Sequence, residues 1–401
     1  MGRSLRIADI VRAHGPAYME RFVESMLPSH ARAMRAIANC RTPALGGHLG
    51  ECAQCGQRHL LYHSCRHRAC PQCGHDSTAK WLAAQRELLL PVRYFHVVFT
   101  LPAELRRLVR SHQEVLFGVL FRAAFETLST LWADPKHLGA AQIGALAVLH
   151  TWTRTLEWHP HIHMLVPAGG LDADGRTWRS VSRRRKLFLV PVRALAKHFR
   201  GRFLALARSA LPGVAFPEIP WDKPWVVYAK PTVQGADKLL AYLGRYVHRT
   251  ATSDEAVAAM DETTVTFTYR DSRDHQRKSM RLPAHEYLRR LLQHVPPKGL
   301  HRVRSFGLLH PAHRDTLRRL QLLLAPRAAP PIPPTPPATK PRLRCPHCAQ
   351  GTLRLVLRLS AAECTALAAT ASAADAAATL RASVAAPGAR APPATSPGTA
   401  R

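Results

Sequence analysis

The chain has 401 residues, with 57 Lys and Arg against 26 Asp and Glu, and its formal net charge is +31 before any of the 23 histidines is counted. Such a basic balance indicates a partner rich in phosphate, although charge alone does not separate DNA from RNA or an anionic membrane. A hydrophobic content of 46% supports at least one sizeable core and excludes wholesale disorder. No run of about 18 uncharged apolar residues and no secretory signal is found, so we expect a cytoplasmic protein without a membrane partner.

The first predicted elements are two short helices within residues 7–39, where apolar residues recur at helical spacing on either side of Pro28. Residues 40–75 are rich in Cys, His and Gly and have no long apolar period, which is typical of loops folded around a metal ion. We therefore predict a helical and zinc-binding N-terminal domain over residues 1–90.

Two Cys-x-x-Cys pairs in this region have the spacing of a zinc ribbon, in which four thiolates complete one tetrahedron. In a reducing compartment, clustered cysteines favour metal binding over disulfides. We predict one closed structural zinc site with four ligands: Cys52, Cys55, Cys70 and Cys73.

Other ligands for this zinc site remain open. Cys65 is the chief alternative, and enough further candidates are present to hold a second ion: Cys40, His48, His59, His63, His67 and His75. A separate pair, Cys345 and Cys348, lies far downstream with only Cys364 near it. A degenerate zinc finger and a chance pair explain this second pair equally well.

Strands and helices intermingle over residues 91–324, which predicts a single α+β domain. Apolar and β-branched runs predict strands at 94–101, 142–152, 161–166, 225–229 and 265–269. Helical spacing predicts helices at 104–132, 191–211, 237–249 and 284–294. The strands on either side of residues 153–160 could form a hairpin.

The composition changes after this domain. Residues 325–342 form a Pro-rich linker that cannot pack a core, and residues 343–359 hold the second Cys-x-x-Cys pair in a possible zinc knuckle. Residues 360–401 are rich in Ala and Pro, and we expect this tail to be disordered.

Three histidines alternate along the chain at His159, His161 and His163. Alternate residues of a strand project from the same face, so these imidazoles could hold one catalytic divalent ion that polarises a phosphate oxygen. Taken alone, an incidental run of histidines on a half-exposed strand explains the motif equally well.

Two tyrosines, Tyr242 and Tyr246, lie four residues apart on the predicted helix 237–249 and therefore share one face. Such a pair more often packs in a core, but Lys238, Arg245 and Arg249 give it a cationic setting that suits a phosphodiester. A phenol is a weak nucleophile until its target phosphate is made electrophilic, and the histidines could supply the metal that does so. A covalent phosphotyrosine conserves the energy of the broken bond, which agrees with the absence of a GxxxxGK[ST] loop from the sequence.

Five ordered blocks over residues 40–324 resemble the rolling-circle transposases of bacterial insertion-sequence family ninety-one, which belong to the HUH endonuclease superfamily. The blocks are SCRHRACPQC, PVRYFHVVFTLP, EWHPHIHMLVPAGG, YLGRYVHR and HVPPKGLHRVRSFGLL. Two features depart from this family: the segment TATSDEAV lacks an expected Ile-Ser-Asn stretch, and the Pro-rich linker and tail have no known counterpart.

The resemblance implies an RRM-like palm, an antiparallel sheet with flanking helices, preceded by a small zinc-binding module. It implies that His161 and His163 bind Mg²⁺ or Mn²⁺, with His159 as the local candidate for a third ligand, and that Tyr242 and Tyr246 are catalytic. The implied activity is cleavage and transfer of single-stranded DNA through 5′-phosphotyrosine intermediates, in a nucleoid-associated protein of undetermined oligomeric state.

Two other functions are alternatives to this one. A non-catalytic zinc-ribbon regulator would bind DNA through its charge, but it has no use for the histidine strand or the tyrosine helix. A transposase with three metal-binding carboxylates is disfavoured because the chain has only 26 acidic residues, and only Glu157 adjoins the histidines.

Overall fold

A computed structural model describes residues 5–181, 190–232, 235–247, 251–325 and 343–370. The chain divides into two compact units, each assembled from two segments that are distant in the sequence. Unit 1 consists of Met1–Ala38 and Cys65–Ile332, and unit 2 consists of Asn39–Ser64 and Pro333–Arg401. The predicted linker falls almost wholly on residues 326–342, which lie outside the described part of the chain.

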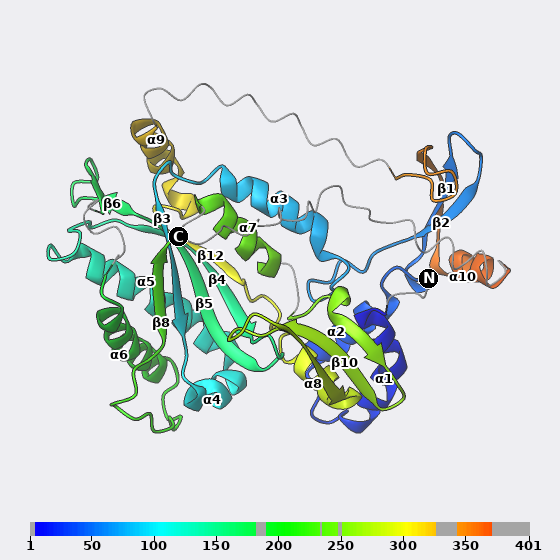
Figure 1. The fold of residues 1–401 in the computed structure, drawn as a ribbon, viewed down its shortest axis with the longest axis horizontal. Helices are drawn as coiled ribbons and strands as arrows, with labels where there is room; N and C mark the ends of the chain where they lie inside the picture. Colours follow the sequence, from blue (N-terminus) through cyan, green and yellow to red (C-terminus); the bar gives the residue numbers. More distant parts are fainter. Residues whose placement is uncertain (1–4, 182–189, 233–234, 248–250, 326–342, 371–401) are drawn as a thin grey trace, which may run out of the picture. The chain divides into compact units, whose positions relative to one another are not determined.

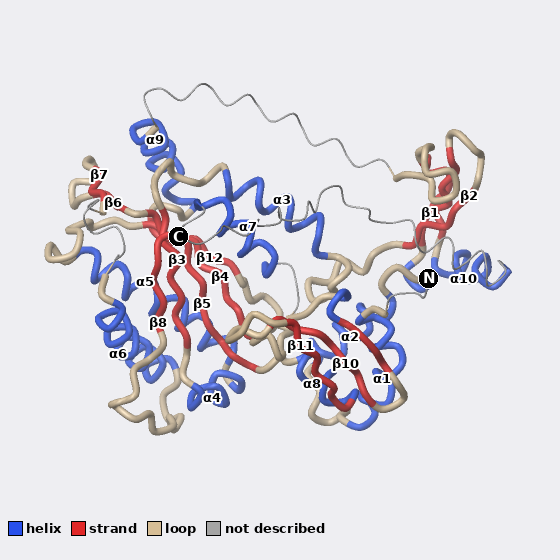
Figure 2. Tube along the Cα trace, in the orientation of Figure 1, coloured by secondary structure: helices blue, strands red, loops and turns tan. Residues whose placement is uncertain are grey.

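Unit 1 is built on a five-stranded antiparallel sheet with the order β12-β4-β5-β3-β8, drawn as red strands in Figure 2. Its strands are β3 (Tyr94–Thr100), β4 (Gly144–Trp152), β5 (Trp158–Pro167), β8 (Val227–Pro231) and β12 (Val303–Gly307). The predicted hairpin is confirmed, because β4 and β5 are antiparallel neighbours. The sequence reading missed β12, a short strand of mixed polarity whose place depends on its pairing with β4.

One face of this sheet is covered by α5 (Gln113–Ala133) and α6 (Val192–Ala210). Alternate residues of β4 and β5 point into this core, among them Ala147, Leu149, Ile162 and Met164. Phenylalanines from the helices meet them there: Phe117, Phe121, Phe199 and Phe203. Burying such a side chain contributes roughly 2–3 kcal/mol, so this face is the main stabilising layer. Among the described helices, α5 alone is long and apolar enough to cross a membrane, and these core contacts account for its composition.

A single predicted helix over residues 104–132 corresponds to three elements. These are η2 (Ala103–Leu105), α4 (Arg106–Ser111) and α5. His112 leaves helical geometry between α4 and α5, with φ −124° and ψ 43°. The apolar period continues through this break, so the sequence pattern did not reveal it.

The opposite face of the sheet packs against α7 (Gly235–Val247), α9 (Arg314–Leu324) and α3 (Gly74–Arg86). Leu240 and Leu243 of α7 lie in the same core as Val148 of β4 and Leu165 of β5. Helices α3 and α7 run side by side (Figure 1). A Cβ added at Gly244 would lie 2.7 Å from a side-chain methyl of Leu82, so a larger residue at that position would require Leu82 to move.

A smaller sheet in unit 1 has the order β11-β10-β9, with strands β9 (Val257–Met260), β10 (Thr264–Arg270) and β11 (Arg277–Pro283). Helix α8 (Ala284–Leu292) follows it and packs on α1 (Ile7–Arg21), which is followed by α2 (Pro28–Asn39). The remaining elements in the described part of unit 1 are β6 (Gly169–Leu171), β7 (Trp178–Ser180), η4 (Asp254–Ala256) and η5 (Pro311–His313). Residues Ile7, Ile10 and Val11 of α1 are buried within unit 1.

Unit 2 contains a three-stranded antiparallel sheet with the order β13-β1-β2. Its elements are η1 (Pro43–Leu45), β1 (Gly47–Cys52), β2 (Arg58–Tyr62), β13 (Leu353–Leu359) and α10 (Ala361–Thr370). Two expectations are corrected here. Residues 40–75 contain paired strands and not only loops, and residues 361–370 of the predicted disordered tail form a helix. Strands β1 and β2 pair with each other, and β13 adds a third strand at the other edge of β1. Helix α10 packs against η1, a segment more than 300 residues earlier in the chain that local sequence patterns do not reveal.

Candidate metal and tyrosine site

Three histidines form a cluster on the central strands of unit 1: His150, His161 and His163. One ring nitrogen from each lies within 4.8 Å of those of the other two. His150 of β4 is the direct antiparallel partner of His161 on β5, and His163 lies two residues further along the same face. This face is the one that α7 covers.

Hydrogen bonds orient two of these rings. His161 donates from Nδ1 to the carbonyl oxygen of His159 at 2.6 Å, which leaves a lone pair on its Nε2 atom. Nδ1 of His163 lies 2.8 Å from Nε2 of His96, and when His163 is the donor its own Nε2 carries a lone pair. Such contacts fix ring orientation in metal sites.

Burial keeps these imidazoles neutral at pH 7. Desolvation lowers the pKa of His161 to about 4, and it lowers the pKa values of His150 and His163 well below the ordinary value. The pKa of His96 is also lowered to about 4 by burial. Neutral imidazole is the form that binds metal, so the donor set fits a divalent cation that leaves other coordination positions open.

His159, the predicted third ligand, lies outside this cluster. It projects from the same side of β5, but its Nδ1 atom is 2.7 Å from Nη2 of Arg106, which donates to it. The structure therefore brings His150, and not His159, together with His161 and His163. Strand alternation correctly selected one face of β5, but it could not show which residue of β4 lies opposite.

Tyr242 of α7 lies beside the histidines and is half-buried. Its ring centroid is 6.1 Å from that of His163 and 6.4 Å from that of His96, in edge-on arrangements. The phenol is thus placed at the cluster by the same helix that closes this face of the sheet.

The other predicted residues of this helix are described less fully. Tyr246 and Arg245 belong to α7, but their side chains lie outside the described part of the structure, and so does the whole of Arg249. Lys238 is exposed in the first turns of α7. The helical spacing of the two tyrosines is as predicted, since α7 spans both positions.

The sequence reading missed three residues near the cluster: His96, His150 and Tyr228. Each is a polar or amphipathic residue within an apolar strand, which was the only available signal. Tyr228 of β8 has 41% of its surface exposed, and its ring lies 5.6 Å from that of His96. Lys230 on the same strand has its Nζ atom 5.5 Å from the Tyr228 ring centroid.

Comparison with known proteins gives the family. Residues 144–316 match a family model described as "Putative transposase", and residues 10–101 match a "Transposase zinc-binding domain" of the IS91 type. A protein of Sinorhizobium fredii (strain NBRC 101917 / NGR234), "Putative transposase y4qJ", is 41% identical over 328 residues, covering 77% of this chain and 81% of the relative. The chain belongs to the IS91 family of transposases.

A second relative of the transposase is the "Transposase for insertion sequence element IS801" of Pseudomonas savastanoi pv. phaseolicola. It is 29% identical over 294 residues, which cover 67% of this chain and 68% of the relative. No solved structure matches the chain. The family resemblance seen in the sequence is thus confirmed, and DNA is the partner on which such transposases act.

The transposase carries a zinc-binding domain whose cysteines the structure groups differently from the sequence prediction. In unit 1, Cys65 lies with Cys70 and Cys73, and the Sγ atoms of Cys65 and Cys73 are 3.6 Å apart. Cys52 and Cys55 lie in unit 2 with Cys345 and Cys348. The predicted set of Cys52, Cys55, Cys70 and Cys73 is therefore divided between two groups, because β1 pairs with a strand from the C-terminal region.

Arg68 of the cysteine loop has a structural contact in the transposase. It donates from Nη1 to the carbonyl oxygen of Leu300 at 2.7 Å and from Nη2 to that of Pro296 at 3.2 Å. These bonds attach the loop at residues 65–73 to the segment at residues 296–300.

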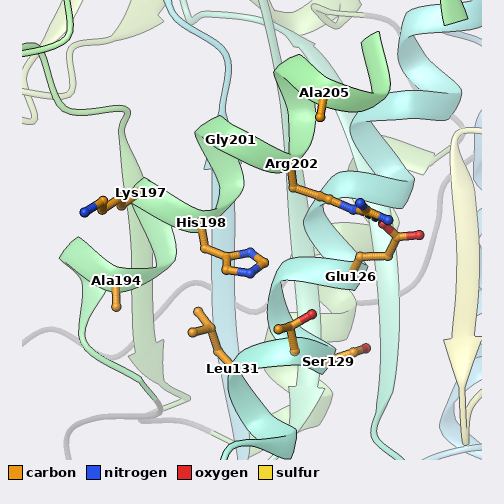
Figure 3. Close-up of a pocket in the computed structure, with 10 residues that line it drawn as sticks. Glu126, Ser129, Leu131, Ala194, Lys197, His198, Gly201, Arg202 and Ala205 are labelled. Atoms are coloured by element: carbon orange, nitrogen blue, oxygen red, sulfur yellow. Dashed lines mark hydrogen bonds and ion pairs between the residues drawn. The ribbon is translucent and has the colours of Figure 1, made fainter. Parts of the chain in front are cut away.

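A groove of about 850 Å³ lies between α5 and α6 (Figure 3). Arg202 and Glu126 form an ion pair on its wall, near His198. These helices cover the face of the sheet opposite to α7, so the groove does not connect with the histidine cluster. Its lining includes no cysteine and no tyrosine.

Proposed function

We propose that this transposase is an HUH-type nuclease and transesterase that cleaves single-stranded DNA and joins strands through 5′-phosphotyrosine intermediates in rolling-circle transposition. The observation that carries this proposal is the position of Tyr242 against His163, in a cluster of three neutral histidines on the central strands. The antiparallel sheet with helices on both faces is consistent with an RRM-like palm.

We propose His150, His161 and His163 as the ligands of the catalytic metal, with His150 in place of His159. A bound Mg²⁺ or Mn²⁺ would polarise the scissile phosphate and stabilise the charge that develops on its oxygens. Imidazole donors bind transition metals better than Mg²⁺, which prefers oxygen ligands. We therefore expect Mn²⁺ to support activity at lower concentration than Mg²⁺.

The residues of the chain supply the nucleophile. The phenol of Tyr242 loses its proton as its oxygen bonds to phosphorus, and the bond from phosphorus to the 3′ oxygen breaks. The departing 3′ oxygen gains a proton and becomes a hydroxyl. A 3′ hydroxyl of another strand can then attack the phosphotyrosine in the reverse sense, so strand transfer needs no ATP.

We propose that Tyr246 provides a second nucleophile from the same face of α7. A helix places residues four apart on one face, so both phenols could reach a metal held by the histidines. A second strand could then be cut while the first is still covalently bound.

Exposed residues beside the site suit single-stranded DNA. Tyr228 offers an aromatic face on which a base can stack, and Lys230 and Lys238 can neutralise phosphates. The high net charge of the chain supports the same partner.

The test uses a single-stranded oligonucleotide from an end of the element, labelled at its 3′ end, with Mn²⁺ or Mg²⁺. Cleavage should transfer the label to the protein, because the 5′ phosphate of the 3′ fragment becomes attached to tyrosine. The double variant Tyr242→Phe, Tyr246→Phe should form no adduct. Tyr269→Phe, which changes a tyrosine in the smaller sheet, is the matched control and should still form it.

Three results would contradict the proposal. Metal-dependent nicking by the double variant without an adduct would identify water as the nucleophile. Tight DNA binding with no nicking by the unmodified protein would favour the non-catalytic regulator. An adduct that persists in the double variant and disappears with Tyr228→Phe would identify Tyr228 as the nucleophile.

A further inference from the structure

Unit 2 contains a group of four cysteines drawn from opposite ends of the sequence: Cys52, Cys55, Cys345 and Cys348. The C-terminal pair lies outside both matched regions, which cover residues 10–101 and 144–316. Sγ of Cys52 is 3.7 Å from Sγ of Cys348, and Sγ of Cys55 is 3.7 Å from Sγ of Cys345. All four sulfurs lie within 4.8 Å of one another.

These distances suit a metal and not disulfides. A disulfide requires sulfurs about 2.0 Å apart. Sulfurs bound to one zinc at about 2.3 Å in a tetrahedron are about 3.8 Å apart. The two cross-pairs therefore have the separation of adjacent corners of a zinc–thiolate tetrahedron.

The backbone repeats the same turn at each cysteine pair. In the first, the N–H group of Gly56 donates to the carbonyl oxygen of Cys52 at 3.1 Å; in the second, that of Ala349 donates to Cys345 at 2.9 Å. Both residues that follow the second cysteine have positive φ, +68° at Gly56 and +58° at Ala349. A non-glycine residue rarely adopts this conformation. The positive φ at Ala349 therefore indicates that the group of cysteines holds the turn in this shape.

Polar groups around the sulfurs complete the site. The N–H group of Gln54 donates to Sγ of Cys52 at 3.4 Å, and that of Gly351 donates to Sγ of Cys348 at 3.3 Å. Nε2 of His59 lies 3.4 Å from Sγ of Cys345. A Cβ at Gly351 would overlap Sγ of Cys52, so glycine allows the chain to pass close to the sulfurs. Such contacts stabilise thiolates in metal sites.

We infer that Cys52, Cys55, Cys345 and Cys348 bind one structural zinc ion. This ion joins residues 343–370 to the hairpin of β1 and β2. All four positions of the ion are filled by thiolates, so the site stabilises the fold and does no chemistry. The paired cysteines are 290 or more residues apart, so the zinc closes a loop that contains nearly all of unit 1. Losing the ion should release residues 343–370 from β1.

The first test measures zinc in the purified full-length chain. Cys345→Ser should contain one zinc equivalent fewer than the unmodified protein, and Cys345→His, which keeps a metal ligand, should retain it. Cys364→Ser is the matched control, because Cys364 is a buried cysteine of unit 2 outside the group. An unchanged zinc content in a Cys345→Ser, Cys348→Ser double variant would overturn the inference.

The second test uses the full-length chain with a site for a specific protease inserted between residues 326 and 342. After cleavage, the C-terminal fragment should co-elute with the rest of the protein in size-exclusion chromatography and should separate after zinc is chelated. Co-elution that survives complete zinc removal would overturn the inference. So would a count of free thiols in denaturant that shows disulfides within the group. Neither readout depends on DNA cleavage.

Discussion

The histidine cluster of unit 1 and the cysteine group of unit 2 both join residues that are far apart in the sequence, but they are supported differently. The histidines lie on adjacent strands of a five-stranded sheet that is covered on both faces. The cysteines lie beside a three-stranded sheet whose strand β13 leaves Leu355, Val356 and Leu357 more than half exposed. Unit 2 thus buries much less apolar surface around its ligands.

This difference indicates what each metal does. The hydrophobic layers of unit 1 hold the imidazoles in place, so the catalytic ion that we propose would enter a site that already exists. A small sheet with little core commonly needs a metal to stabilise it. We therefore expect metal removal to stop the reaction in unit 1 without unfolding it, and to unfold unit 2.

The largest effect should come from His161→Gln. We expect DNA nicking to fall by more than about 100-fold, because the scissile phosphate is no longer polarised. The thermal unfolding of unit 1 and the zinc content should change little. A variant that nicks normally would remove His161 from the metal site, and one that loses zinc would break the distinction between the two regions.

Single tyrosine variants should have a smaller effect on the first step. Tyr242→Phe or Tyr246→Phe alone should leave nicking of one DNA end at roughly half its rate or somewhat lower, because one of the two proposed nucleophiles remains. Complete transposition in cells should be abolished. If either single variant still transposes at the normal frequency, one tyrosine is sufficient and the two-nucleophile cycle is wrong.

Cys70→Ser tests the cysteines of unit 1. We expect the loss of one zinc equivalent and faster proteolysis at residues 65–73, since the loop would keep the hydrogen bonds of Arg68 but lose its metal. The zinc of unit 2 should remain bound, as metal analysis of the Cys70→Ser, Cys345→Ser double variant would show by a further loss. Well-folded wild-type protein without zinc would contradict both assignments.

Acid should destabilise unit 1 through its buried histidines. Burial lowers the pKa of His294 to about 3 and that of His96 to about 4. The unfolded chain takes up these protons below about pH 6.5, whereas the folded chain does not until the lower pKa values are reached, so stability is lost as the pH falls through this window.

A His294→Gln variant isolates one of these protons. Between pH 6 and pH 4.5, the free energy of unfolding of the metal-free protein should fall less steeply, by about 1.4 kcal/mol per pH unit. His285→Gln, at an exposed position of α8, is the control and should keep the original slope. Equal slopes in all three proteins would show that His294 is protonated in the folded state.

The smallest effect should come from the positive charges near the histidine cluster. The logarithm of the affinity for single-stranded DNA should fall with the logarithm of salt concentration, with a slope of about −0.7 per phosphate neutralised. Lys238→Gln should reduce the magnitude of that slope by about 0.7. Lys136→Gln, on the loop after α5, is the control. A slope unchanged in both variants would remove Lys238 from the DNA surface.

The local patterns of the sequence determined most elements of unit 1. Apolar and β-branched runs predicted β3, β4 and β5, and helical spacing predicted α6, α7 and α8, with ends within a few residues of those observed. The same patterns placed His161 and His163 on one face of a strand and two tyrosines on one face of a helix. These features repeat over two to four residues, so they can be read from neighbouring residues.

Only the tertiary structure decided which distant segments meet. His150 joins His161 because β4 and β5 pair in one particular register, and His96 joins His163 because β3 lies on the other side of β5. Cys345 and Cys348 join Cys52 and Cys55 because β13 pairs with β1. Strand order and register depend on how whole layers bury their apolar faces, and no local period of the sequence records that choice.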